Sequence, residues 1–229
     1  MAAAAVETFA PSRRPGRAAA SPTPFSLQAF SIRAVDLAGA ALALLLFAPL
    51  FLIVAAAIKL EDGGPVFYAH GRLGRGGRGF GCLKFRSMAP DAAERLQALL
   101  AASAEARAEW ARDHKLKADP RRTAVGIFLR RTSLDELPQL LNVLRGEMSL
   151  VGPRPIVAEE RARYGRRFAS YVRVRPGITG LWQVSGRNDT TYRRRVALDH
   201  AFVRGYGLRL YLRILVVTIP AVLLRRGSY

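Results

Sequence analysis

The chain has 229 residues and a mass of 25.1 kDa, which suits one domain plus attachments. Half of its residues are hydrophobic, so a core can form, and the formal net charge of +19 predicts an acidic partner such as nucleic acid, anionic lipid or a phosphorylated substrate. The single cysteine, Cys82, excludes an intramolecular disulfide and a zinc site built from several cysteines. We interpret Cys82 as a small buried strand residue.

The N-terminal part of the chain contains a basic tail and then a long apolar segment. Residues 1–29 are rich in Ala, Pro, Ser and Arg without a hydrophobic period, which predicts a disordered tail. In residues 37–58 every position is apolar, Gly or Pro, and about 20 such residues span a bilayer as a helix. Pro49 lies in the middle, and basic residues flank both ends. This pattern predicts a re-entrant membrane helix over 30–60, broken at Pro49 and returning to the same face. A kinked transmembrane span is the alternative.

The next segment predicts a β-hairpin. Residues 65–68 and 80–86 have extended character, and a glycine- and arginine-rich stretch, 71–79, lies between them. Residues 74–79 match G-x-G-x-x-G formally, but no helix follows, so the context for dinucleotide binding is missing. A hairpin turn that carries arginines is the plainer interpretation, and phosphate or headgroup contact is the sharper one.

Most of the remaining chain predicts helices, so the expected fold class is α+β and mostly helical. Helical patterns cover residues 91–115, 158–173 and 190–206. A last apolar segment, 208–224, contains Arg209, Arg213 and Pro220 and is too interrupted to span a bilayer. We interpret it as an interfacial amphipathic helix with snorkelling arginines.

The stretch 130–155 carries the chemistry. Ser133-x-x-Glu136 has the form of a capping box and Gly146 that of a helix stop, which together predict a short amphipathic helix with Asp135 and Glu136 in its first turn. The plain alternative is that these two acids only complement the helix dipole.

Phosphate chemistry is the functional interpretation of the same stretch. A helix start stabilises negative charge, so Asp135 should stay ionised and serve as a nucleophile or a Mg²⁺ ligand. Arg154 is held between two prolines, and a rigid guanidinium suits bidentate contact with phosphate. A surface turn is the alternative for Arg154.

These residues resemble the bacterial sugar transferases, which are monotopic phosphoglycosyl transferases. The resemblance covers about residue 30 to the C-terminus and is of the minimal, exopolysaccharide-priming form. It is carried by these segments: Arg33-Ala-Val-Asp36, Gly64-Pro-Val-Phe67, Lys84-Phe-Arg-Ser-Met88, Thr132-Ser-Leu-Asp-Glu-Leu-Pro-Gln139, Met148-Ser-Leu-Val-Gly-Pro-Arg-Pro155, Arg175-Pro-Gly-Ile-Thr-Gly-Leu-Trp-Gln183 and Leu198-Asp199.

The resemblance implies a reaction and a set of site residues. Asp135 would attack the β-phosphate of a UDP-sugar, expel UMP and carry the sugar phosphate until a polyprenyl (undecaprenyl) phosphate accepts it. Glu136 would assist, and Mg²⁺ would bridge the carboxylate and the diphosphate. The family positions near the phosphates fall on Lys84, Arg86 and Arg154, and with less support on Gln183, Arg187 and Asp199.

The resemblance also implies a location and partners. A catalytic domain over 61–229 would lie on the cytoplasmic face of the bacterial inner membrane, where the charge of +19 attracts anionic lipids. Galactose and glucose phosphate are the expected cargoes, and the sequence leaves a homodimer open. Two alternatives come from other classes. A membrane-tethered nucleic-acid-binding protein is disfavoured because no recognisable module occurs. A conventional glycosyltransferase is disfavoured because the chain has no Asp-x-Asp motif.

Overall fold

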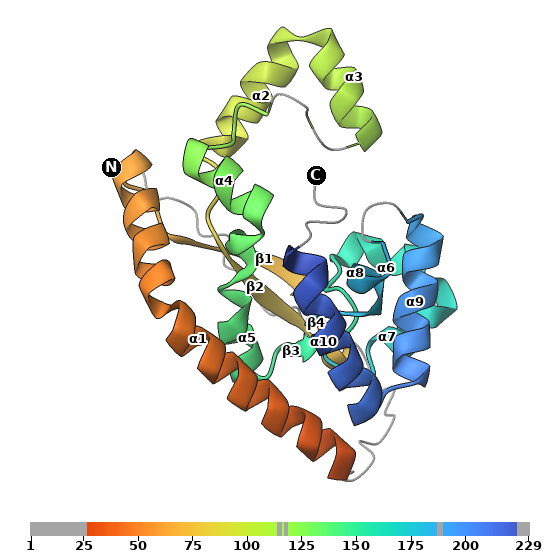
Figure 1. Cartoon of the computed structure of the whole chain (residues 1–229). Helices are drawn as coiled ribbons and strands as arrows, with labels where there is room; N and C mark the ends of the chain where they lie inside the picture. Colours follow the sequence, from red (N-terminus) through yellow and green to blue (C-terminus); the bar gives the residue numbers. More distant parts are fainter. Residues whose placement is uncertain (1–26, 114–115, 117–118, 187–189, 224–229) are drawn as a thin grey trace. The chain divides into compact units, whose positions relative to one another are not determined.

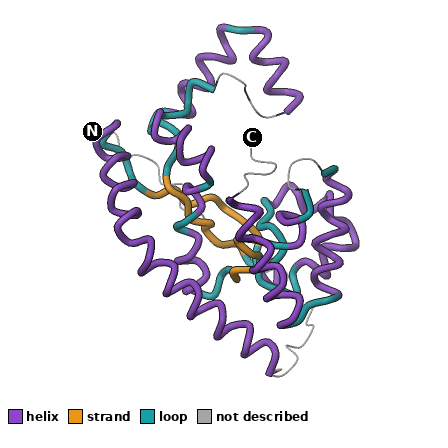
Figure 2. The backbone as a smooth tube through the Cα atoms, in the orientation of Figure 1, coloured by secondary structure: helices purple, strands orange, loops and turns teal. Residues whose placement is uncertain are grey.

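The computed structural model describes residues 27–113, 116, 119–186 and 190–223. Helix predominates, and the strands are short (Figure 2). In chain order the elements (Figure 1) are α1 (Leu27–Asp62), β1 (Phe67–Leu73), η1 (Arg75–Gly77), β2 (Gly79–Phe85), α2 (Ala92–Ala102), α3 (Ala104–Asp113), α4 (Ala124–Thr132), η2 (Leu134–Glu136), α5 (Gln139–Arg145), β3 (Ser149–Val151), η3 (Ala158–Glu160), α6 (Arg161–Tyr164), η4 (Gly165–Arg167), α7 (Phe168–Tyr171), β4 (Gly177–Thr179), α8 (Leu181–Val184), α9 (Tyr192–Arg204) and α10 (Leu208–Leu223).

The helix α1 is the longest element. It is one continuous helix of 36 residues that contains Pro49. By length and composition it could cross a membrane, and only 11% of its most apolar window is buried. Its exposed side chains include large apolar groups such as Leu45, Leu52 and Ile53. Such a surface suits lipid better than water. The predicted break at Pro49 and the return to the same face stay predictions.

The fold is α+β and mostly helical, as predicted. The hairpin β1–β2 forms around the glycine-rich turn, and Cys82 is buried in β2 at 2% exposure. The helices α9 and α10 lie close to the predicted 190–206 and 208–224, and α10 continues through Pro220. The predicted helix over 91–115 is in fact two, α2 and α3, which form a helical hairpin (Figure 1). The predicted tail over residues 1–29 lies almost wholly outside the described residues.

The chain divides into two compact units. Unit 1 takes its described residues from Met1–Leu44, Ala69–Cys82 and Gln139–Tyr229, and unit 2 takes its own from Leu45–Tyr68 and Leu83–Pro138. Both α1 and the hairpin contribute residues to each unit. The predicted domain boundaries at residues 29/30 and 60/61 stay predictions.

Unit 1 is centred on a buried acid in the long apolar helix α1. Asp36 is 1% exposed, and its Oδ1 accepts hydrogen bonds from the Ser149 hydroxyl, the Leu150 N–H and the Tyr211 hydroxyl at 2.6–2.8 Å. These bonds tie α1 to β3 and α10. Since a buried carboxylate without partners is costly, three donors on one oxygen make the burial tolerable. Ile32, Val151, Phe202, Tyr211 and Ile214 form the apolar core around it.

A parallel strand pair in unit 1 was not predicted. The strand β3 pairs with β4, with Ser149 opposite Gly177 and Val151 opposite Thr179. A β-carbon at Gly177 would collide with the backbone of Gly152, so the close approach of the two strands requires glycine there. The pair holds the turn that carries Arg154 next to the segment that leads to α8.

Unit 2 has a smaller core made by three elements. Val54 and Ile58 of α1 pack with Phe85 of β2 and Leu129 of α4, and all four side chains are at most 5% exposed. A β-carbon at Gly126 would collide with the backbone of Ser87, so α4 lies directly on the chain that leaves β2. This packing positions the acidic pair described next.

Candidate active site

The acidic pair lies in unit 2 on a single 3₁₀ turn, η2, and not at the start of an α-helix. Ser133 closes α4 in a left-handed conformation, with φ of 58° and its N–H bonded to the Arg130 carbonyl. Its side chain caps nothing, so the predicted capping box is wrong. The α-helix begins only at Gln139, and it ends before Gly146 as predicted.

Lys84 holds the two carboxylates together. Its Nζ lies 2.8 Å from Glu136 Oε1 and 3.3 Å from Asp135 Oδ2. The Asp135 side chain is 11% exposed, whereas the Glu136 side chain is 32% exposed. The Lys84 bond goes to Asp135 Oδ2, and no hydrogen bond to Asp135 Oδ1 is present among the described residues. The arrangement therefore leaves one oxygen of a nearly buried carboxylate available for attack.

Burial has the largest effect on the pKa of Asp135. Desolvation raises the pKa of Asp135, while the Lys84 ammonium and the Arg130 guanidinium lower it and the Glu136 carboxylate raises it further. The two acids lie in the first turn of the 3₁₀ helix η2 and not of an α-helix, and stabilisation of the ionised form by a helix start stays a prediction. Lys84 is the cation with the largest lowering effect on the pKa of Asp135, and a desolvated carboxylate is a stronger nucleophile than a hydrated one.

Arg130 is a site residue that the sequence analysis did not single out. It lies on the last turn of α4, and its Nε donates to the Ser87 hydroxyl at 2.9 Å. Burial lowers its pKa, and the nearby Asp135 carboxylate raises it. The sequence could have indicated Arg130, because it is a cation five residues before Asp135, at the end of the helical segment that leads into the acidic pair.

Arg86 lies close to Lys84 in sequence, but the protein already occupies most of its donors. It forms a two-point ion pair with Asp62 at the end of α1, and it donates to the carbonyls of Pro65 and Met88 at 2.6 and 3.1 Å. The side chain is 8% exposed. Contact of Arg86 with a phosphate stays a prediction, and it would require some of these bonds to be exchanged.

The acidic pair fits a magnesium ion. Two carboxylates converge on one cationic group, Lys84, and Mg²⁺ is usually held through one or two carboxylates together with phosphate oxygens and water. In the described part of the chain, no cluster of three or more His, Cys, Asp or Glu side chains could hold a metal by itself. Asp135 and Glu136 would thus share the ion with a phosphorylated substrate.

Arg154 and Asp199 meet in unit 1. The Arg154 guanidinium lies 5.4 Å from the centre of the Trp182 ring, and the backbone and charge of Arg154 both lower the pKa of the Asp199 carboxylate. Asp199 is 2% exposed and accepts a 2.6 Å hydrogen bond from the Tyr164 hydroxyl. Burial raises the pKa of Asp199 to about 6, against the lowering effects of Tyr164 and of the Arg195 and Arg154 charges. Asp199 therefore interacts electrostatically with the turn that presents Arg154.

Arg195 completes this cluster and was not predicted. It is 8% exposed, lies 5.2 Å from the Trp182 ring centre and 5.1 Å from that of Tyr192, and contacts Glu160 at 3.4 Å. Its Nε and Nη2 have no hydrogen-bond partner among the described residues. Spacing could have found it, because Arg195 lies four residues before Asp199 and therefore on the same face of α9.

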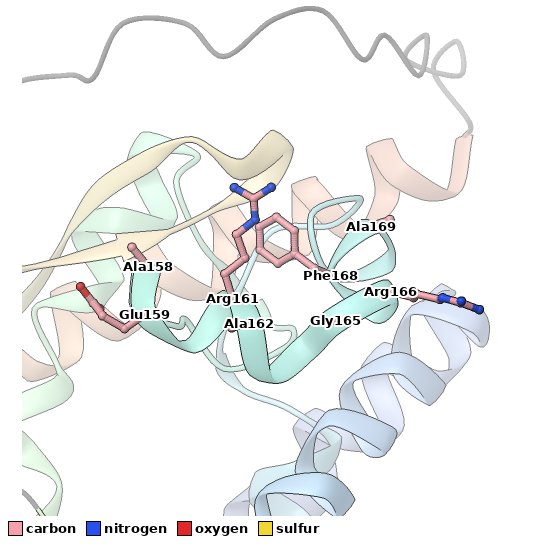
Figure 3. A pocket seen from close by; sticks show the side chains of 8 residues that line it. All are labelled: Ala158, Glu159, Arg161, Ala162, Gly165, Arg166, Phe168 and Ala169. Carbon is pink, nitrogen blue, oxygen red and sulfur yellow. The ribbon is translucent and has the colours of Figure 1, made fainter.

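The other predicted residues have weaker support. Gln183 Nε2 lies 3.5 Å from the Ile178 carbonyl, and its buried Oε1 lacks a partner in the part of the chain that the structure describes. Arg187 lies outside the described residues. A hollow of about 720 Å³ on η3, α6 and α7 is lined by none of the predicted site residues (Figure 3). Arg161 stacks on Phe168 there, 4.9 Å from the ring centre.

The chain matches the bacterial sugar transferase family over residues 27–225. It belongs to that family. It is 52% identical over 197 residues to the exopolysaccharide production protein ExoY of Rhizobium meliloti (strain 1021). The matched residues cover 86% of this chain and 87% of the relative. It is 50% identical over 200 residues to the undecaprenyl-phosphate galactose phosphotransferase of Salmonella typhimurium, covering 87% of this chain but 42% of the relative.

A third member of the family has a more detailed name. The UDP-glucose:undecaprenyl-phosphate glucose-1-phosphate transferase of Caulobacter vibrioides is 40% identical over 210 residues, covering 86% of this chain and 71% of the relative. The matched region contains the acidic pair, Lys84, Arg130 and the Arg154 turn. The predicted family membership is confirmed.

Proposed function

We propose that this protein transfers a sugar 1-phosphate from a UDP-sugar to a polyprenyl phosphate, the priming step of exopolysaccharide synthesis. The observation that carries the proposal is the nearly buried Asp135, paired through one oxygen with Lys84 and open at the other, in a bacterial sugar transferase. Relatives in the family are named as phosphotransferases that act on undecaprenyl phosphate, and this chain is accordingly a phosphoglycosyl transferase.

The proposed reaction has two displacements at one phosphorus atom. In the first, an Asp135 oxygen forms a bond to the β-phosphorus of the UDP-sugar, the bond from that phosphorus to the bridging oxygen breaks, and UMP leaves. In the second, a phosphate oxygen of the polyprenyl phosphate attacks the same phosphorus, and the bond to Asp135 breaks. The product is a polyprenyl diphosphate sugar, and the carboxylate is restored. Covalent capture divides a transfer between a soluble donor and a membrane acceptor into two steps.

The surrounding residues would support these displacements by charge. Lys84 keeps Asp135 ionised against its burial and lies where the extra negative charge of the transition state develops. Arg130 adds a second positive charge near the same carboxylate. Glu136 is more exposed than Asp135, and we assign it the positioning of the diphosphate.

Magnesium would add to this charge. When bound by Asp135 and Glu136, the ion would neutralise the diphosphate, which is the contribution that metals make in phosphoryl transfer. The protein would supply the two carboxylates, and the diphosphate and water would supply the remaining ligands.

The anchor would bring this site to the lipid phosphate. We assign α1 to the bacterial inner membrane, with a re-entrant path and the catalytic residues on the cytoplasmic face. The exposed apolar side chains of α1 and α10 support membrane association, and the charge of +19 favours anionic lipid headgroups. The names of the relatives make galactose and glucose the first sugars to test.

The product released identifies the reaction. Membranes containing the protein would be mixed with Mg²⁺, a polyprenyl phosphate and a panel of UDP-sugars. We expect release of UMP with one or a few sugars, and loss of that release with Asp135→Asn. Release of UDP would instead identify a conventional glycosyltransferase, and UMP release unaffected by Asp135→Asn would remove the covalent mechanism.

The topology has its own test. Tags at both termini should lie on the same side of the membrane, so in intact right-side-out vesicles both should be protected from a protease. Accessibility of one tag only would establish a transmembrane span and contradict the re-entrant path.

A further inference from the structure

The C-terminal end of α1 contacts the helix that leads into the acidic pair. The Glu61 carboxylate accepts hydrogen bonds from the backbone N–H groups of Ala124 and Val125, at 2.7 and 3.2 Å. These are the first two residues of α4. The next two N–H groups are satisfied by Thr123, whose hydroxyl and carbonyl accept from Gly126 and Ile127. The Ile127 bond is the first of the regular helix ladder, so Ala124, Val125 and Gly126 carry the N–H groups that the helix start leaves unpaired, and two of these three depend on the membrane helix.

The following residue of α1 holds the strand that carries Lys84. Asp62 forms a two-point ion pair with Arg86, and it also accepts the Gly64 N–H at 3.0 Å. Arg86 is two residues after Lys84 on the chain leaving β2. A bidentate Arg–carboxylate pair fixes orientation as well as distance, so the end of α1 also restrains the base of the Lys84 strand.

The two contacts meet again near the nucleophile. Arg130, at the far end of α4, donates to the Ser87 hydroxyl at 2.9 Å, and Lys84 bonds both acids. Asp135 therefore lies between two supports, the end of α4 and the Lys84 side chain. Glu61 and Asp62 are consecutive residues at the end of α1. Glu61 holds the start of α4, and Asp62 holds, through Arg86, the strand that carries Lys84.

We propose that Glu61 and Asp62 are positioning residues that set Asp135 and Lys84 relative to each other from the end of the membrane helix. The inference rests on the proposed function for its catalytic readout. Neither carboxylate contacts the acidic pair directly, so each acts through another element: Glu61 through α4, and Asp62 through Arg86 and β2. A helix start can bind an anion, and at the start of α4 the Glu61 carboxylate already occupies that position. Glu61 therefore contributes position and not substrate binding.

The consequence is that the covalent step depends on how the helix end is held. A displacement of about 1 Å of a reacting group can cost about 10²-fold in rate. Loss of Glu61 frees the first turn of α4, and the shift passes along a nine-residue helix to the turn that carries Asp135. Donor binding changes less, because neither Glu61 nor Asp62 lies against the acidic pair.

The test compares Glu61→Ala with Thr123→Ala. Both variants remove a cap from the same end of α4, but only the first detaches α4 from α1. Asp135-linked phosphosugar would be counted first to give the fraction of active protein, and the rate of UMP release per active molecule and the KM for the UDP-sugar would follow. We expect Glu61→Ala to lower kcat by about 10- to 100-fold with less than about threefold change in KM, and Thr123→Ala to change kcat by less than about threefold. Equal losses of kcat in the two variants would overturn the proposal.

Two further substitutions separate position from charge. In Glu61→Gln the amide oxygen can still accept from Ala124 and Val125, so most of the rate should return although the charge is gone. Glu61→Asp keeps the charge but is one methylene shorter, and it should lose part of the rate. If Glu61→Gln is as slow as Glu61→Ala, the contribution is electrostatic and the positioning role is wrong. These variants also serve if Glu61→Ala does not fold.

Hydrogen exchange reads the same link without the reaction. Glu61→Ala should speed amide exchange in residues 133–137 as well as in the first turn of α4, whereas Thr123→Ala should affect only the first turn. Faster exchange confined to the first turn in both variants would contradict the link. If the wild-type protein releases no UMP with any sugar, the proposed function fails, and the exchange pattern still decides whether α1 positions the turn.

Discussion

A buried aspartate lies among the predicted site residues of each unit, Asp135 in unit 2 and Asp199 in unit 1, and the two differ in what surrounds them. Asp135 in unit 2 and Asp199 in unit 1 are both less than 10% exposed, and burial raises the pKa of both. Asp199 Oδ2 accepts a short hydrogen bond of 2.6 Å from the Tyr164 hydroxyl. Asp135 faces Lys84 at the longer distance of 3.3 Å and keeps one oxygen without a described partner.

We propose that this comparison separates a carboxylate that reacts, Asp135, from one that supports its surroundings, Asp199. Burial and a raised pKa are common to both, so neither property identifies the nucleophile. The partners differ: Asp199 Oδ2 accepts a short bond from a tyrosine hydroxyl, whereas Asp135 faces the Lys84 ammonium through Oδ2 alone. We therefore assign the chemistry to Asp135 and the support of the Arg154 turn to Asp199.

The largest expected difference is between the two Asp→Asn variants. Asp135→Asn removes the nucleophile, so turnover should fall by about 10⁴-fold or more. Asp199→Asn keeps the size and the acceptor oxygen, so turnover should fall by about tenfold or less. UMP release measures both, and flotation with vesicles should show unchanged membrane association for both. Similar losses in the two variants would break the distinction.

Lys84→Gln should have the next largest effect. The ammonium stabilises the ionised form of Asp135 and the developing charge on the phosphate, so its loss should lower the covalent step by about 10²- to 10³-fold. It should also move the acid limb of the pH–rate profile to higher pH, because Lys84 lowers the pKa of Asp135. A slower enzyme with an unmoved acid limb would show that Lys84 acts on the substrate alone.

The wild-type pH profile gives a smaller but direct effect. Asp135 must be ionised to attack, and burial raises its pKa above the ordinary value of 3.8. The rate of UMP release before lipid acceptor is added should therefore fall as the pH drops, with a midpoint above 3.8. A rate that stays flat down to pH 4 would contradict the raised pKa.

The smallest effect concerns stability. The pKa of Asp199 is about 6 in the folded protein and near 3.8 when unfolded, so the folded state binds the proton more tightly. Its contribution to the free energy of unfolding is therefore greatest below pH 3.8 and is lost as the pH rises to about 6, by at most about 3 kcal/mol. Thermal unfolding across this range should be less pH-dependent for Asp199→Asn than for the wild type, and an equal dependence would contradict the shift.

The sequence predicted the parts of the fold that local patterns determine. The extended segments of the hairpin, the helical period of α9 and the apolar run of α1 are all visible within short windows. The motif residues Asp135, Glu136 and Lys84 were also predicted, and the structure brings them together. The catalytic roles of all the named site residues stay predictions.

The start of the α5 helix could have been predicted better. The capping-box pattern at Ser133 was followed, although Pro138 lies five residues later. Proline is tolerated in the first turn of a helix and is costly beyond it, so Pro138 favours a helix that starts next to it, and α5 starts at Gln139.

Other features depend on partners that are distant in the sequence. Asp36 is stabilised by Ser149 and Tyr211, more than a hundred residues away, and β3 and β4 are only three residues long. No periodicity in a short window reveals such contacts. The same holds for Glu61, which gives no local sign that it caps α4.

The covalent intermediate is the most direct test of the central claim. The protein would be incubated in membranes with Mg²⁺ and a UDP-sugar labelled in the β-phosphate, without lipid acceptor, then denatured, digested and mapped. Label on the peptide that contains Asp135, absent in Asp135→Asn and discharged by polyprenyl phosphate in the native protein, is the predicted result. A protein that makes the lipid product while no label ever becomes attached to it would contradict the claim.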